Sequence, residues 1–175
     1  MQITFAQSID PVQPRDIPIT RVAITKPSDR VRKTTEMGRK AIVPYGLYRA
    51  HGFFNALLGR RRQGESGWKQ VVTEDDLRDL WDALQNMFEF DRSAARGEMT
   101  TRGLYIFSHD NERGCAQAHK LFELVKTAKC GDCVRDFEEY KPAISVPGAE
   151  VLPGEVPESV RVDGFPGVTL TRLVG

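Results

Sequence analysis

Features of membrane and secreted proteins are absent from this 175-residue sequence. No apolar run approaches the roughly 20 residues that a bilayer-spanning helix needs. The first residues show no basic region followed by an apolar stretch, so we expect no secretory signal. The only cysteines are Cys115, Cys130 and Cys133, an odd count that argues against a disulfide framework and favours a reducing compartment. We therefore expect a cytoplasmic protein with no membrane partner.

Motifs of common enzyme classes are absent too. The sequence has no P-loop, no dinucleotide glycine motif and no recognisable set of nucleophile, base and orienting residue. His51, His109 and His119 share no spacing. Cys130 and Cys133 form a Cys-x-x-C pair, but a zinc site needs four ligands, and a redox pair should open a helix rather than close one. These absences favour a protein that is not an enzyme, with no cofactor or metal ion.

Positive charge, by contrast, is concentrated in one part of the chain. Residues 21–62 hold eleven Lys or Arg and two acids, a formal charge of +9, whereas 63–175 carry −7 and the whole chain +1. A concentrated basic field most often meets a polyanion. Nucleic acid is the leading candidate because phosphate backbones reward clustered Lys and Arg through counterion release. Two alternatives remain open, a solvated charged loop and a module that binds an acidic protein surface, such as a neighbour's residues 136–175.

The basic residues surround a predicted β-hairpin. Residues 19–25 and 41–43 have the β-branched or apolar character of strands, and a polar, basic loop joins them. Loops longer than about 12 residues are usually functional or mobile. We expect this hairpin, at about 19–45, to project from the body. Met37 gains nothing from a core there, so it is either an ordinary surface residue or a wedge that separates stacked bases.

The remaining pattern predicts an α+β fold, with helices on one face of a mainly antiparallel sheet. Thr73 is a strong N-cap before a helix whose apolar residues share one face. The predicted strands are 2–9, 45–58 and 102–108, the last one central and covered on both faces, and the predicted helices are 74–90 and about 115–128. Residues 59–67 are expected to be a solvated loop.

Residues 136–175 contain five prolines and seven acids against three bases. We expect them to form an acidic tail that is extended over the surface or partly disordered, which leaves residues 1–135 as a partial domain that includes the hairpin.

Aromatic and basic residues outside the hairpin add further candidates. Strands 45–58 and 102–108 are expected to be neighbours, and some of their aromatic rings could stack on bases, although core packing is the stronger interpretation for most. These rings are Tyr45, Tyr48, Phe53, Phe54, Tyr105 and Phe107. Arg92, Arg96 and Arg102 are either ordinary surface arginines or an extension of the basic surface.

Several segments resemble the backbone subunit of type I-C CRISPR Cascade, the Cas-seven family in its Csd-two/Csh-two branch. The resemblance covers about residues 2–128 in unbroken order. The segments that carry it are 19–23 (ITRVA), 37–40 (MGRK), 43–52 (VPYGLYRAHG), 91–97 (DRSAARG) and 102–105 (RGLY).

This resemblance implies an RNA-recognition-like (ferredoxin-like) palm with a β-hairpin thumb, in a non-catalytic subunit that polymerises head-to-tail along CRISPR RNA. The thumb would press between bases and kink the guide, leaving the rest to pair with target DNA. Partners would be CRISPR RNA, copies of the chain and other Cascade subunits. The expected RNA-binding residues are Arg21, Lys26, Arg30, Arg32, Lys33, Met37, Arg39, Lys40, Tyr45, Arg49, Arg92, Arg96 and Arg102.

The sequence also departs from the family. The first strand and helix of the palm and an Asn-Pro-Asn-Gly-type loop have no counterpart in it. We expect the palm to expose a sheet edge and an apolar face, which favours association with a partner chain or with itself. The rival enzyme interpretation is an endoribonuclease of the same superfamily that uses His109 or His51 as base.

Overall fold

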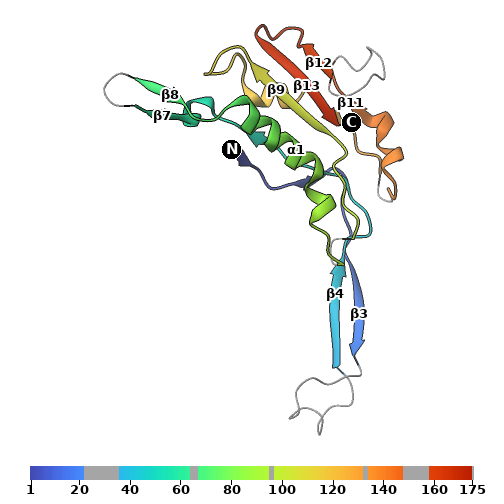
Figure 1. Ribbon diagram of the computed structural model, residues 1–175. Coiled ribbons are helices and arrows are strands. Elements are labelled where there is room, and N and C mark those ends of the chain that lie inside the picture. Colours follow the sequence, from blue (N-terminus) through green and yellow to red (C-terminus); the bar gives the residue numbers. More distant parts are fainter. Residues whose placement is uncertain (22–35, 64–66, 95–96, 132–133, 148–157, 175) are drawn as a thin grey trace.

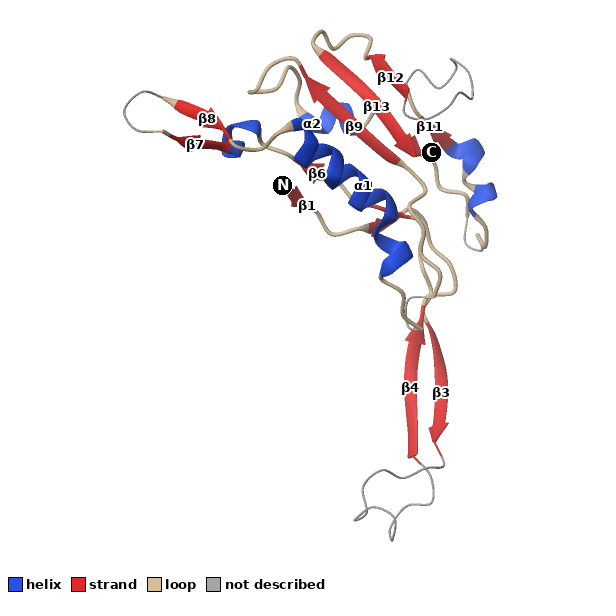
Figure 2. Cartoon of the chain, in the orientation of Figure 1, coloured by secondary structure: helices blue, strands red, loops and turns tan. Residues whose placement is uncertain are grey.

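The computed structural model shows a mixed α+β chain with one long helix and several small sheets (Figures 1 and 2). It describes residues 1–21, 36–63, 67–94, 97–131, 134–147 and 158–174. Every strand pairing in these ranges is antiparallel. The predicted α+β class with mainly antiparallel strands is confirmed.

The N-terminal segment runs antiparallel to residues 47–53, and each of the predicted strands 2–9 and 45–58 is broken into short pieces. Two backbone hydrogen bonds outside the strands continue the ladder, from Thr4 N–H to the His51 carbonyl at 2.8 Å and from Ile9 N–H to the Leu47 carbonyl at 2.9 Å. The strands are β1 (Gln2–Ile3) with β6 (Gly52–Phe53) and β2 (Gln7–Ser8) with β5 (Tyr48–Arg49). A short 3-10 helix, η2 (Ala56–Gly59), replaces the end of the predicted strand 45–58.

The predicted basic hairpin is present and projects away from the rest of the molecule (Figure 1). Strand β3 (Arg15–Arg21) pairs with β4 (Glu36–Ile42) over seven residues. β3 begins four residues before the predicted start at 19, because Pro18 does not interrupt it. Proline lacks only a donor, and an edge strand tolerates that loss. We call β3 and β4 the thumb hairpin.

Helix α1 (Glu74–Phe90) matches the predicted helix 74–90. Thr73 caps it as expected: its hydroxyl accepts from Asp76 N–H at 3.2 Å, and the Asp76 carboxylate accepts from Thr73 N–H at 2.7 Å. This reciprocal pair satisfies two backbone donors at the helix start. The apolar side of α1 is half-buried and none of its residues is fully buried, so the helix lies against the body without entering a deep core.

The best-packed region is a three-stranded sheet of order β12-β13-β9 (Figure 2). Its strands are β9 (Leu104–His109), β12 (Glu158–Arg161) and β13 (Val168–Val174). Val168 and Leu170 of the middle strand are buried with Val162, and Leu121 of α2 (Ala118–Phe122) completes this cluster. The prediction of 102–108 as a central strand beside 45–58 is therefore wrong. β9 lies at an edge of this sheet, and its partner is β13.

The expectation of an extended tail at 136–175 is also wrong for the residues described there. Besides β12 and β13, they form two short 3-10 helices and a strand, η3 (Phe137–Glu139), η4 (Lys141–Ala143) and β11 (Ile144–Ser145), the last paired with β10 (Lys126–Thr127). Val160 and Val162, with Val168 and Leu170, alternate on either side of a Gly-Pro turn, a hairpin signal that the acidic, proline-rich composition obscured. The division of the chain into domains stays a prediction.

Two smaller corrections concern residues 59–67 and 115–128. The first range was expected to be a loop, but β7 (Arg60–Arg62) pairs with β8 (Trp68–Gln70) in a second hairpin. The second was expected to be one long helix, but α2 has five residues and β10 follows soon after. Lys126 and Thr127 gain the backbone partners of β11, which the isolated helix pattern could not reveal.

A buried carboxylate links the N-terminal segment to the C-terminal part of the chain. Asp10 is 7% exposed. It accepts hydrogen bonds from the Tyr140 hydroxyl at 2.6 Å and from the backbone N–H groups of Cys130 and Gly131, each at 3.3 Å. The Tyr140 bond, followed by the two backbone donors, holds the pKa of Asp10 below its ordinary value. Burial and the same bond raise the pKa of Tyr140.

Asp10→Asn is expected to destabilise the protein in a pH-dependent way. Because the pKa of Asp10 is lower in the folded chain than its ordinary 3.8, the carboxylate stabilises the fold above about pH 4 and this contribution disappears as the pH falls through the folded value. Urea unfolding should therefore show the largest gap between wild type and variant near neutral pH and a shrinking gap below about pH 4. The exposed Asp163→Asn is the matched control, and a gap for Asp10→Asn that stays constant with pH would contradict this role.

Candidate nucleic-acid interface

The thumb hairpin presents basic side chains on both of its faces. Arg39 lies opposite Pro18, and Lys40 lies opposite Ile17. Successive residues of a strand point to opposite faces, so Met37 shares a face with Arg39, while Lys40 lies on the other. A nucleic-acid strand that passes over either face of the hairpin would therefore meet a cation.

These side chains are not used by the fold of the described residues. Met37 is 77% exposed and Arg39 is exposed as well, while Lys40 is half-buried. In the described part of the chain, neither Arg39 nor Lys40 forms an ion pair. Arg39 and Lys40, with the exposed apolar residues Ile17 and Ile19, remain available to a partner. Because a two-stranded hairpin is only marginally stable by itself, such a partner would also stabilise it.

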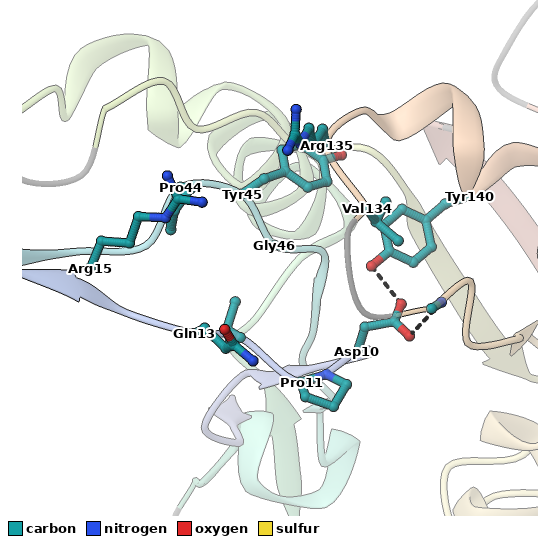
Figure 3. A pocket seen from close by; sticks show the side chains of 12 residues that line it. Asp10, Pro11, Gln13, Arg15, Pro44, Tyr45, Gly46, Val134, Arg135 and Tyr140 are labelled. Carbon is teal, nitrogen blue, oxygen red and sulfur yellow. Dashed lines mark hydrogen bonds between the residues drawn. The ribbon is translucent and has the colours of Figure 1, made fainter.

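An open cavity of about 410 Å³ lies where the thumb hairpin joins the body (Figure 3). Arg15, the first residue of β3, and Tyr45, just after β4, line it together with Arg135. The Tyr45 ring stacks with that of Tyr140 at a centroid distance of 6.5 Å, and burial raises the pKa of its hydroxyl. The predicted contact Tyr45 is thus half-buried at the hairpin base, in a cavity with two arginines. Sequence reasoning missed Arg15 and Arg135, although the Ile17–Ile19 alternation signals that the strand starts early.

Other predicted RNA contacts have partners within the chain. The Arg49 guanidinium donates to the Phe122 carbonyl at 2.5 Å, and burial lowers its pKa. Arg92 pairs with Glu89. The guanidinium of Arg102 lies 4.9 Å above the Phe137 ring. Arg21 ends β3 on the thumb hairpin. Lys26, Arg30, Arg32, Lys33 and Arg96 lie outside the described residues.

The two histidines of the enzyme interpretation are engaged in packing or hydrogen bonding. His51 stacks on Phe122 at 4.2 Å, and burial, with help from Arg49, lowers its pKa. His109 accepts a hydrogen bond from Cys115 N–H on Nδ1 at 3.0 Å. Of the Cys-x-x-C pair, Cys130 is an exposed free thiol and Cys133 lies outside the described residues.

The described ranges contain neither a metal-binding cluster nor a membrane-spanning helix. No group of three or more His, Cys, Asp or Glu side chains there could hold a metal ion. No helix there has the length and apolar character needed to cross a membrane.

The sequence model of the family CRISPR-associated protein Cas7 matches residues 1–145. The chain belongs to this family. Membership confirms the broader resemblance: the protein is a CRISPR-associated, RNA-binding backbone subunit whose partners are CRISPR RNA and other Cascade subunits. The antiparallel α+β architecture is consistent with the RNA-recognition-like fold of Cas7, and Cas7 backbone proteins are generally non-catalytic. No curated protein matches the chain.

Proposed function

We propose that this Cas7 protein is the guide-binding subunit of a type I-C Cascade, and that its thumb hairpin holds guide phosphates and kinks the RNA. The observation that carries the proposal is the thumb hairpin itself. It projects from the body (Figure 1). It bears Arg39 and Lys40, neither of which forms an ion pair in the described part of the chain. Type I-C assignment follows the segment resemblance, which is densest between residues 37 and 52.

Phosphate contacts explain how one protein can hold guides of any spacer sequence. Lys and Arg bound to backbone phosphates fix position and orientation but carry no base information. The predicted phosphate contacts on the thumb hairpin and in the residues that join its strands are Arg21, Arg30, Arg32, Lys33, Arg39 and Lys40. The bases would remain free to pair with target DNA, which is how guide-directed complexes read sequence.

Met37 supplies the kink in this proposal. It is highly exposed and shares a face of β4 with Arg39, so an apolar wedge and a phosphate contact lie two residues apart. Apolar side chains inserted between bases unstack them and bend the strand. A repeat of this contact in each subunit would kink the guide at regular intervals.

Apolar surface supports the proposed head-to-tail filament. The paired segments 2–9 and 47–53 leave Ile3, Phe53 and Phe5 exposed, the last at 97%. Apolar side chains exposed to this extent favour association with another chain. In the proposed assembly the next copy of the chain covers these residues. We place this assembly in the cytoplasm.

Precursor CRISPR RNA tests the proposal. The chain should bind guides of unrelated spacer sequence with equal affinity, because its contacts are to phosphates. As a non-catalytic subunit it should also leave a precursor intact after prolonged incubation. Affinity that depends on the spacer would contradict phosphate holding. Cleavage that disappears in His51→Ala or His109→Ala would favour the endoribonuclease interpretation instead, and displacement by an acidic protein but not by single-stranded RNA would favour a protein-interaction module.

A further inference from the structure

The second hairpin, β7 and β8, projects from the body in a different direction from the thumb hairpin (Figure 1). Its strands read Arg60-Arg61-Arg62 and Trp68-Lys69-Gln70. Five of these six side chains are exposed, and the sixth, Arg60, is half-buried. The segments that carry the resemblance to the Cas-seven family do not include this hairpin.

Charge on the second hairpin is arranged in a way that destabilises the free protein. Arg61 lies directly opposite Lys69 in the register, so two cations share one face without an acid between them. Like charges opposite one another weaken a strand pair. No ion pair of Arg61, Arg62 or Lys69 occurs among the described residues, and their heads are exposed. A bound anion would relieve this repulsion.

The other face of the second hairpin carries an exposed aromatic ring. Trp68 is 66% exposed and pairs across the strands with Arg62. Tryptophan carries a large apolar surface and is enriched at interfaces, where that surface is buried. An indole beside a guanidinium provides both a stacking surface for a base and a contact for the adjoining phosphate.

The base of the second hairpin is anchored, so its outer residues are held at a fixed place. Arg60 forms an ion pair with Glu112, which lies between β9 and α2. The N–H groups of Val71 and Val72 donate to the Gly59 carbonyl at 2.8 and 3.2 Å. A Cβ at Gly59 would lie 3.0 Å from the Gln70 side chain, so the side chains of the returning strand pack closely against this glycine.

Single-stranded nucleic acid fits this combination better than a protein surface does. An acidic protein surface would pair with the cations but would make no use of the exposed indole. An apolar protein surface would cover the indole but would leave three cations desolvated and unpaired. A single strand offers regularly spaced phosphates for the cations and unpaired bases for the indole.

We propose that the second hairpin is a separate contact for single-stranded nucleic acid, with Trp68 stacked on a base and Arg61, Arg62 and Lys69 on phosphates. This site goes beyond the thumb hairpin and does not depend on it. The strand is either RNA or DNA, since stacking and phosphate contacts are common to both.

Intrinsic fluorescence tests the stacking directly. The chain has two tryptophans, so Trp81→Phe leaves Trp68 as the sole indole. Oligouridylate and oligothymidylate of equal length should quench its emission, and the stronger ligand identifies the source. The converse variant, Trp68→Phe, reports from Trp81 on the half-buried side of α1 and should show little quenching. If Trp68 emission is quenched to the same extent by raising the protein concentration without oligonucleotide, the quenching reports self-association and the proposal is overturned.

Binding measured by anisotropy on the full chain gives a second readout that does not rely on Trp81 variants. Trp68→Leu should lower affinity about tenfold, whereas Trp68→Phe retains most of it because the ring remains. Replacing Arg61, Arg62 and Lys69 with alanine should reduce the salt slope by about 2. Unchanged affinity in all of these variants overturns the second site. A loss of affinity in the Arg39→Ala/Lys40→Ala variant alone would support the thumb proposal and overturn the second site. A loss of affinity in the second-hairpin variants alone would support the second site and overturn the thumb proposal.

Discussion

Leu170→Ala is expected to lower the free energy of unfolding by about 2–5 kcal/mol, the range for a buried leucine truncated in a core. Leu170 is 1% exposed and lies in the middle strand of the β12-β13-β9 sheet, opposite Phe107. Val168, Val162 and Leu121 surround it, so the cavity left by truncation cannot collapse easily. For a chain of this size the loss corresponds to a fall in Tm of roughly 5–15 °C.

Leu58→Ala is the matched control for this truncation. Leu58 is 82% exposed, and a surface change of this kind should alter stability by no more than about 0.5 kcal/mol. Urea denaturation and thermal melting of both variants give the comparison. Equal effects would contradict the burial of Leu170 and with it the place of β13 at the centre of the sheet.

The second large effect concerns the thumb hairpin and the residues that join its two strands. Replacing Arg32, Lys33, Arg39 and Lys40 with alanine should weaken guide RNA binding by on the order of a hundredfold or more, because each lost charged contact costs about 1 kcal/mol or more. The loss should be uniform across spacer sequences, since phosphate contacts carry no base information. Titration of labelled guides with different spacers measures it.

A charge-matched variant separates the thumb hairpin from the overall field of the protein. Arg78, Arg113, Lys120 and Lys126 are exposed and lie outside both hairpins. Their replacement removes the same formal charge, but affinity should fall only slightly. A loss as large as that of the thumb variant would mean that net charge, and no particular contact, governs binding.

Local signals explain what the sequence could predict. Helix α1 is specified by its own residues: Thr73 caps it, acids occupy its first turn and its apolar side chains share a face. The thumb hairpin is likewise visible from β-branched strands around a polar stretch. Strand β3 begins before the predicted residue 19, because in a two-stranded ribbon both strands are edges and the backbone donor that Pro18 lacks costs little.

Pairings between distant residues explain what the sequence could not predict. The apolar run at 104–107 correctly predicts a strand, but nothing local indicates that this strand lies at a sheet edge or that its partner is β13, about sixty residues further on. Composition misled at the C-terminus, because prolines and acids outside the strands outweighed the alternation within them. Asp10 shows the same difficulty, since a single carboxylate near the start of the chain gives no hint of Tyr140 as its partner.

The candidate site was predicted in its broad location but not in its details. Charge concentration pointed correctly to a projecting basic hairpin that bears Met37, Arg39 and Lys40. It did not distinguish these from Arg49, whose guanidinium is bound to the Phe122 carbonyl within the fold. The basic stretch 21–62 also includes Arg60, Arg61 and Arg62, which belong to the second hairpin, so charge alone does not separate the two hairpins.

The salt dependence of guide RNA affinity tests the central claim most directly, namely that the thumb hairpin grips the phosphate backbone. Each phosphate neutralised on a single strand contributes about −0.7 to the slope of log affinity against log salt concentration. Wild type should show a steep slope, and the variant lacking Arg32, Lys33, Arg39 and Lys40 should show one that is shallower by about 3. Identical slopes for the two proteins, or a flat response in wild type, would contradict the account.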